Sequence, residues 1–331
     1  MNLSDEQGAV PYHGLDPGTV LDAIDTLGVW TDGRLLALNS YENRVYQVGL
    51  EGADPVVVKF YRPGRWTTDA ILEEHAFAQE LAEHEIPVVA PQIIAGATLH
   101  EYRGFRFAVY PRRGGRSPDL DDSNALEWVG RFLGRLHLVG ASKQFQHRRE
   151  LSIEAMGQQA VETVLSMELI PRHIAEAYAT ITRDVLIRVQ ACWERAGAFA
   201  TLRLHGDCHP GNILWTDAGP HFVDLDDAVT GPAVQDLWML LSGDRQEMTT
   251  QLLDLLAGYE DFNEFDRREL HLIEALRTLR IMNYAAWLAR RWHDPAFPLA
   301  FPWFGSDRYW EEHVLSLREQ AALMDEPPLV V

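Results

Sequence analysis

The chain has 331 residues, of which 47% are hydrophobic and 24% are charged, and its formal net charge is −20. This length favours two domains with a sizeable core, and the composition is ordinary for a soluble globular enzyme. The acidic balance argues against a nucleic-acid or anionic-membrane partner, because both require a basic surface.

Neither a membrane span nor a disulfide framework is expected. No apolar run approaches the ~20 residues that cross a bilayer, and residues 1–6 lack the basic and apolar regions of a signal peptide. The chain has two cysteines, Cys192 and Cys208, too few for a disulfide scaffold. We therefore expect a cytoplasmic protein.

The first third of the chain shows strand patterns interrupted by turns. A short helix is expected at residues 18–27, and a longer one at 69–85 that begins after Thr67 and Thr68, both good N-cap residues. Strands are expected at 34–38, 44–48, 56–61, 92–97 and 105–110. Together they predict a small lobe with a five-stranded antiparallel sheet and one helix.

Three residues of this lobe are candidates for nucleotide binding. Ser40 lies in the polar turn 39–43, where backbone N–H groups and a small hydroxyl suit phosphate. Lys59 has apolar or aromatic neighbours in a strand, so it either faces water or meets an anion. Glu74, or alternatively Glu73, can reach back from the helix to pair with Lys59, as the corresponding glutamate does in kinases.

From residue 112 onward the pattern becomes helical. Helices are expected at 125–139 and 171–196, and Pro111–Gly115 is the expected hinge beside adenine. We therefore predict an α+β, bilobal, protein-kinase-like fold, with an N-terminal lobe at residues 1–111 and a larger, mostly helical lobe at 112–331.

The segments 204–214 and 222–227 carry the strongest functional signal. Asp207 is followed five positions later by Asn212, and Asp224 comes after a predicted hairpin, 17 positions beyond Asp207. This order is typical of kinase-like phosphotransferases, in which the first carboxylate accepts the alcohol's proton and the other two groups hold Mg²⁺ on the ATP phosphates. Amide and carboxylate oxygens are ligands that Mg²⁺ prefers.

His209 and Asp236 are two further candidates in this region. His209 lies two residues after the predicted base, where it either donates a hydrogen bond to the transferred phosphoryl group or only shapes the loop. Asp236 either braces the catalytic loop by accepting backbone N–H groups or is an acid favoured by the helix dipole. The aromatic and proline-rich segment 287–310 is interpreted as core packing rather than as a substrate platform.

A zinc site is a weaker alternative for the same loop. His205, Asp207 and His209 alternate and are all possible zinc ligands. That site would leave Asn212 and Asp224 without a role, and it offers no obvious further ligand.

The chain resembles the bacterial stress response kinase A family, Ser/Thr protein kinases with an aminoglycoside-phosphotransferase-like fold. The likeness covers residues from about 35 to the C-terminal Pro-rich end and rests on the motifs 39–46, 58–63, 71–75, 204–214, 222–227, 235–241 and 294–298. It implies a cytoplasmic, ATP- and Mg²⁺-dependent kinase of protein Ser/Thr that is linked to stress and is monomeric. It also implies roles for Ser40 at the ATP site, Asp207 as proton acceptor, and Asn212 and Asp224 on Mg²⁺.

Three departures from the general protein-kinase pattern leave other functions open. Gly206 stands where an arginine precedes the catalytic aspartate, His209 stands where a lysine follows it, and no glycine follows Asp224 and Leu225. All three are features of small-molecule phosphotransferases, so a kinase of a small alcohol or amino-acid derivative is the main alternative. A nucleotide-binding scaffold without turnover is a third, which the intact Lys59, Asp207, Asn212 and Asp224 disfavour.

Overall fold

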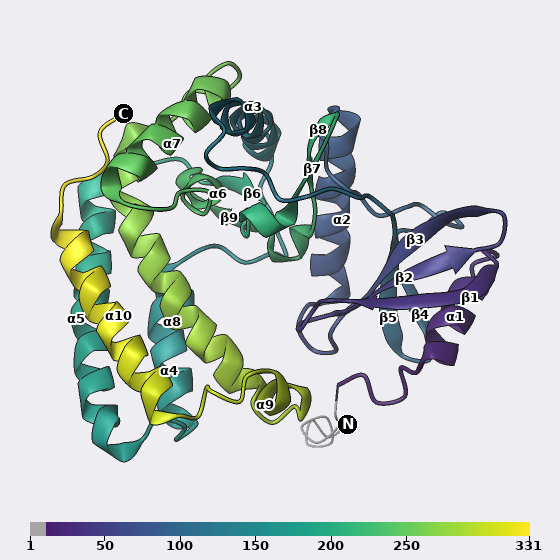
Figure 1. Ribbon diagram of the computed structural model, residues 1–331, viewed down its shortest axis with the longest axis horizontal. Helices are drawn as coiled ribbons and strands as arrows, with labels where there is room; N and C mark the ends of the chain where they lie inside the picture. Colours follow the sequence, from purple (N-terminus) through teal and green to yellow (C-terminus); the bar gives the residue numbers. More distant parts are fainter. Residues whose placement is uncertain (1–10) are drawn as a thin grey trace. The chain divides into compact units, whose positions relative to one another are not determined.

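The computed structural model describes residues 11–331 and contains two compact units. The first unit comprises the described residues up to Pro118 together with two later segments, Phe145–Arg148 and Gly211–Asp227. The second comprises Asp119–Gln144, Arg149–Pro210 and Ala228–Val331. Figure 1 shows the helices and strands of both units, coloured in the order of the chain. The segment on which the signal-peptide expectation rests, residues 1–6, lies outside the described residues.

The first unit is built on one antiparallel sheet, as predicted. Its strand order is β1-β2-β3-β5-β4, formed by Thr31–Leu38, Arg44–Leu50, Ala53–Phe60, Phe105–Pro111 and His100–Tyr102 respectively. Two helices accompany it, α1 (Pro17–Asp25) and α2 (Thr68–Glu83). The side chains of Asp16 and Thr67 cap these helices by accepting N–H bonds from Thr19 and Ala70.

Apolar residues of α1 and the central strands form the core of this sheet. Val20 and Ile24 of α1 pack with Val58, Phe60 and Phe107 of β3 and β5, and all five are fully buried. In the same register Lys59 pairs with Val45 on one side and Ala108 on the other. Lys59 thus lies on a central strand. The alternative in which it faces water from an edge strand therefore does not apply.

The fifth strand of the sheet is formed by other residues than the sequence predicted. Residues 92–97 form only an isolated bridge between Ile94 and Ala97, and the fifth strand is β4, at His100–Tyr102. Ala95 and Gly96 both have positive φ, 51° and 81°, so the chain reverses there instead of extending. The apolar residues of 92–97 suggested a strand, but the turn at Ala95–Gly96 prevents one.

The first unit also contains the hairpin that follows the loop at residues 205–212. Strands β7 (Ile213–Thr216) and β8 (Gly219–Phe222) pair as predicted. Arg116 bridges to Trp215, and Val88 bridges to Phe222. These bonds place the hairpin with the sheet-bearing unit, whereas the predicted boundary at residue 111 assigned it to the C-terminal lobe.

The second unit is mostly helical. Its helices are α3 (Ser123–Gly140), α4 (Gln159–Ser166), α5 (Arg172–Ala196), α6 (Val234–Trp238), α7 (Arg245–Tyr259), α8 (Ile273–Arg291), α9 (Ala296–Ala300) and α10 (Asp307–Asp325). Short strands β6 (Leu202–Leu204) and β9 (Val229–Gly231) pair antiparallel beside them. Short π or 3₁₀ turns of this unit occupy Glu154–Gln158 and Arg267–Leu272, whereas Pro210–Asn212 lies at the unit boundary and Leu225–Asp227 belongs to the first unit.

The C-terminal aromatic segment packs mainly into the core of this unit, as the sequence indicated. Phe297, Phe304 and Trp310 are almost fully buried against α5, α8 and α10. Leu299 and Trp303 remain exposed. Both cysteines are free thiols, and none of the helices in the part of the chain that the structure describes is long and apolar enough to cross a membrane.

Glycines allow α3 and α7 to approach closely. A Cβ at Gly258 of α7 would lie 1.9 Å from the carbonyl oxygen of Glu127, and a Cβ at Gly130 of α3 would lie 2.0 Å from that of Leu255. Backbone atoms cannot move aside as a flexible side chain does. The sequence analysis did not foresee this contact.

We therefore expect Gly258→Ala to lower the free energy of unfolding by about 1–3 kcal/mol or more, because the helices must separate. Gly18→Ala in α1 is the control, since its new Cβ would meet no atom closer than 3.4 Å and alanine favours a helix. Urea unfolding of both variants measures the effect. Equal stabilities would show that the α3–α7 contact tolerates a methyl group.

Candidate active site

A buried carboxylate holds the loop that carries Asp207. Asp236, in the short helix α6, is fully buried and accepts the backbone N–H groups of His205 and Gly206, both at 2.8 Å. The Nε2 atom of His137 lies 3.1 Å from the same carboxylate. The predicted brace is therefore confirmed. The helix-dipole alternative does not account for these bonds, since Asp236 fixes the backbone on the N-terminal side of Asp207.

Asp207 presents its carboxylate beside two basic side chains of the second unit. Arg280 Nη1 on α8 donates to Asp207 Oδ1 at 2.5 Å, and His209 Nε2 lies 3.7 Å from Oδ2. Burial raises the pKa of Asp207, but the Arg280 guanidinium and then His209 outweigh it, so the net pKa is lowered. Asp207 is therefore an ionised, partly exposed carboxylate, as a proton acceptor requires.

The zinc alternative finds no support in this loop. Within residues 11–331, no three His, Cys, Asp or Glu side chains are grouped so that they can hold a metal ion. His205 is fully buried, and its Nδ1 atom faces the Asp207 N–H at 3.4 Å. Its ring is part of the loop's internal packing.

The two predicted magnesium ligands lie in the first unit at the two ends of the β7–β8 hairpin. The Val223 N–H donates to the Asn212 carbonyl at 3.0 Å, which brings the backbone before Asp224 beside Asn212. Asp224 has φ = 61°, a left-handed conformation that non-glycine residues rarely adopt. Its side chain is 54% exposed. A carboxylate is thus held open to solvent next to an amide.

Lys59 points at this carboxylate from strand β3. Its Nζ atom lies 3.1 Å from Asp224 Oδ1 and 3.8 Å from Asp226 Oδ1, and it also lies over the rings of Tyr61 and Tyr110. Burial lowers the pKa of Lys59, but Tyr110 and the two aspartates more than compensate, and the pKa is raised well above its usual value. The lysine is a fixed, buried cation.

The two glutamates of α2 have different environments. Glu73 accepts the backbone N–H groups of residues 146–148 at 2.6–3.0 Å. Glu74 is buried, and its Oε2 atom has no hydrogen-bond partner. Burial, opposed chiefly by Lys59, raises the pKa of Glu74 to about 7.

The expected ion pair between Lys59 and Glu74 is not formed. Among the described residues, the ion pairs of Lys59 join it to Asp224 and Asp226. The physical reason is that Asp224 and Asp226 already pair with the lysine, while burial favours the neutral form of Glu74. Of the two glutamates, Glu74 is the one that raises the pKa of Lys59 electrostatically.

Asp226 is a central residue that the sequence analysis did not single out. It is buried, it accepts a bond from Asn43 Nδ2 at 3.0 Å, and it forms an ion pair with Arg65. Arg148 donates to its backbone carbonyl. The only sequence signal was its place in the Asp-Leu-Asp-Asp run, because Arg65 and Arg148 lie far away in the chain. We call Asp226, Asn43, Arg65 and Arg148 the Asp226 cluster.

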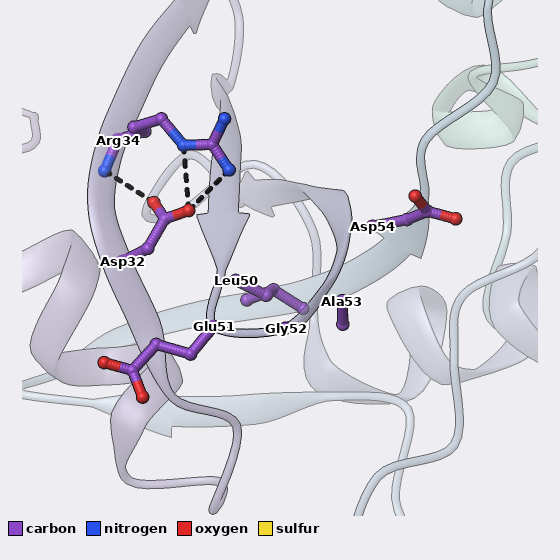
Figure 2. A pocket seen from close by; sticks show the side chains of 7 residues that line it. All are labelled: Asp32, Arg34, Leu50, Glu51, Gly52, Ala53 and Asp54. Atoms are coloured by element: carbon purple, nitrogen blue, oxygen red, sulfur yellow. Dashed lines mark hydrogen bonds and ion pairs between the residues drawn. The ribbon is translucent and has the colours of Figure 1, made fainter.

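The remaining predicted residue, Ser40, lies directly after β1 in the expected turn and is partly exposed. Its role at phosphate stays a prediction. A separate depression at the β2–β3 turn is lined by Asp32, Arg34 and Leu50–Asp54, with Arg34 bonded to Asp32 (Figure 2). It contains none of the predicted site residues, and we assign it no role.

Comparisons with known proteins agree with this arrangement. Residues 34–273 match the phosphotransferase enzyme family. The chain is 48% identical to "Stress response kinase A" of Escherichia coli (strain K12) and 47% identical to "Serine/threonine protein kinase RdoA" of Salmonella typhimurium (strain LT2), each over 97% of both chains.

Solved structures show the same fold at lower identity. Amicoumacin kinase hAmiN, in complex with AMP-PNP, Ca²⁺ and Ami, has a TM-score of 0.70 at 21% identity, and the match covers 95% of both chains. A microcompartment-associated aminopropanol kinase has a TM-score of 0.71 at 17% identity, covering 94% of this chain and 97% of its own. The predicted kinase-like fold is therefore confirmed.

We expect Glu74→Gln to flatten the dependence of stability on pH. The folded-state pKa of about 7 lies above the ordinary 4.5, so the wild type loses stability as pH rises through 7 and Glu74 must ionise while buried. From pH 6 to pH 8 this loss is on the order of 1 kcal/mol. Urea unfolding of nucleotide-free protein at both pH values measures it. Glu83→Gln, exposed on the same helix, is the control, and equal pH slopes for wild type and Glu74→Gln would contradict the assignment.

Proposed function

The chain belongs to the phosphotransferase enzyme family, and within it to the stress response kinase A family, and we propose that it transfers the γ-phosphate of ATP to Ser or Thr hydroxyls of proteins with the help of Mg²⁺. Family membership makes it a kinase that phosphorylates a hydroxyl. The ionised Asp207, held by the buried Asp236, is the observation that carries the proposal.

Asp207 is proposed to accept the proton of the acceptor hydroxyl. As that proton leaves, the hydroxyl oxygen bonds to the γ-phosphorus, the bridging P–O bond of ATP breaks, and ADP departs. His209, 3.7 Å from Asp207, is the candidate for a hydrogen bond to the transferred group. The alternative role of His209 is to shape the loop through its own hydrogen bonds.

Asn212 and Asp224 fit a magnesium ion. Their side chains supply a neutral amide oxygen and an exposed carboxylate, and the positive φ of Asp224 is the kind of strained backbone that clusters at ligand sites. When bound, Mg²⁺ would neutralise charge on the ATP phosphates. Lys59, buried and cationic beside Asp224, is proposed to bind the same phosphates, with Ser40 at the phosphate-covering turn.

Glu74 is proposed to influence Lys59 electrostatically rather than by a direct ion pair. The protein is further proposed to be a cytoplasmic monomer whose partner is a protein substrate and neither nucleic acid nor membrane. Its net charge of −20 supports the last two points.

A kinase of a small alcohol is the second candidate. It is favoured by Gly206 and His209, which replace the arginine and lysine of protein kinases. The structural neighbours named for small molecules are at most 21% identical and show the fold alone. The relatives at 47–48% identity include one named for protein Ser/Thr kinase activity, which favours the first candidate.

One assay separates these functions. The purified full chain is given γ-labelled ATP and Mg²⁺ together with a generic protein, itself, a cell lysate and a panel of small alcohols. We expect label in protein, abolished by chelation and reduced about 10²–10⁴-fold in Asp207→Asn, which keeps the shape of the base but removes its proton acceptor.

Asp217→Asn, exposed in the β7–β8 turn, serves as the control and should label like the wild type. Label confined to small alcohols would replace the protein-kinase proposal with the second candidate. An Asp207→Asn enzyme with a near wild-type rate would remove Asp207 from the mechanism.

A further inference from the structure

Arg280 of α8 lies against the carboxylate that an acceptor hydroxyl must approach. It donates to Asp207 Oδ1 at 2.5 Å while 43% of its own side chain stays exposed, and Asp207 is 23% exposed. A substrate that reaches Asp207 therefore also meets the Arg280 guanidinium. A guanidinium presents a planar set of donors that matches a carboxylate.

The same face of α8 continues with two aromatic side chains. Tyr284 and Trp287 follow Arg280 at the i+4 and i+7 positions, which lie on one face of a helix. Their rings are stacked with centroids 5.6 Å apart; Tyr284 is exposed, whereas Trp287 is half-buried and also packs against Phe297 and Phe301 of the core. Arg291 lies over the Trp287 ring at 5.3 Å. We call Arg280, Tyr284, Trp287 and Arg291 the α8 face, and Figure 1 shows α8 extending toward α9.

The charge of α8 is opposite to that of the chain as a whole. The helix contains four arginines and a single acidic residue, Glu274, which is paired with Arg277. The whole chain has 49 acidic and 29 basic residues. A local excess of arginine beside the reactive carboxylate selects an anionic partner by charge complementarity.

We propose that the α8 face binds an acidic acceptor peptide: a Ser or Thr with Asp or Glu one or two residues away, whose carboxylate pairs with Arg280, and an apolar residue on Tyr284 and Trp287. This inference rests on the proposed protein-kinase function. Seven helical residues from Arg280 to Trp287 span about 10 Å. An extended peptide covers that distance in about three residues, which sets the spacing between the acidic and the apolar position.

The exchange of partners at Arg280 also frees the base. When the substrate carboxylate pairs with the guanidinium, Asp207 Oδ1 becomes available to accept the hydroxyl proton. The Ser oxygen then bonds to the γ-phosphorus, and ADP leaves with the electrons of the broken P–O bond. The Arg280 guanidinium is the largest cause that lowers the pKa of Asp207. When Arg280 pairs with the substrate carboxylate instead, the pKa of Asp207 rises, and Asp207 becomes a stronger base while an acidic substrate is bound.

The test uses three matched peptides and the full-length protein. Each peptide has one Ser, a neighbouring Glu, Gln or Lys, and a Phe three residues beyond that neighbour. We expect the wild type to phosphorylate the Glu peptide with a kcat/KM at least tenfold above that of the Gln peptide. Arg280→Gln should reduce this ratio to within about twofold by raising KM for the Glu peptide, with KM for ATP unchanged, and Arg280→Glu should favour the Lys peptide.

Arg308→Gln, an exposed arginine of α10 paired with Glu312, is the control and should keep the wild-type preference. Equal use of the Glu and Gln peptides by the wild type would overturn this inference alone. So would an Arg280→Gln enzyme that slows on all peptides equally, because Arg280 would then serve the transferred phosphate. Label in small alcohols and in no peptide would overturn the proposed function as well.

Discussion

The buried carboxylate of Asp226 is the interaction on which the loop that carries Asp224, the proposed magnesium ligand, depends. It is contacted by Asn43, Arg65 and Lys59, and the carbonyl of the same residue accepts a bond from Arg148. These partners come from the turn after β1, from β3 and the segment after it, and from residues 145–148, so the side chain and backbone of one residue tie separate parts of the first unit together. Burial raises the pKa of Asp226, but Arg65, Lys59 and Arg148 lower it by more. The net pKa is therefore below its usual value, and the carboxylate keeps its charge. Asp224, two residues earlier, is thereby held exposed in a strained conformation.

The second unit repeats the same principle with Asp236. There a buried carboxylate fixes the backbone before Asp207, while Asp207 itself stays partly exposed. In each unit, then, a buried aspartate with several partners lies close in the chain to a more exposed aspartate with a proposed role in the reaction. Removing one partner of a buried ion pair such as Asp226–Arg65 is strongly destabilising, on the order of 3–5 kcal/mol.

The sequence predicted what depends on local pattern. Lys59 on a strand, the β7–β8 hairpin between Asn212 and Asp224, and the five-stranded antiparallel sheet all follow from alternation, turn residues and spacing, whereas the central position of that strand is known only from the structure. It misplaced the strand at 92–97, because the reversal at Ala95 and Gly96 involves an alanine with positive φ, which no propensity indicates. It also missed the Asp226 cluster and the Arg280–Asp207 pair. Their members lie 73 to 183 residues apart, and such contacts are set by packing rather than by neighbouring residues.

If the Asp226 cluster positions Asp224 as the proposed metal ligand, Arg65→Gln should weaken metal binding, because it removes a partner of Asp226 while leaving every candidate oxygen ligand in place. The measurement is the affinity for Mn²⁺, as a paramagnetic substitute for Mg²⁺, by electron paramagnetic resonance in the presence of AMP-PNP. Arg34→Gln is the control, since Arg34 pairs with Asp32 away from the site. We expect Arg65→Gln to bind Mn²⁺ at least several-fold more weakly than the wild type while circular dichroism shows it folded. A folded Arg65→Gln protein with wild-type Mn²⁺ affinity would contradict the claim.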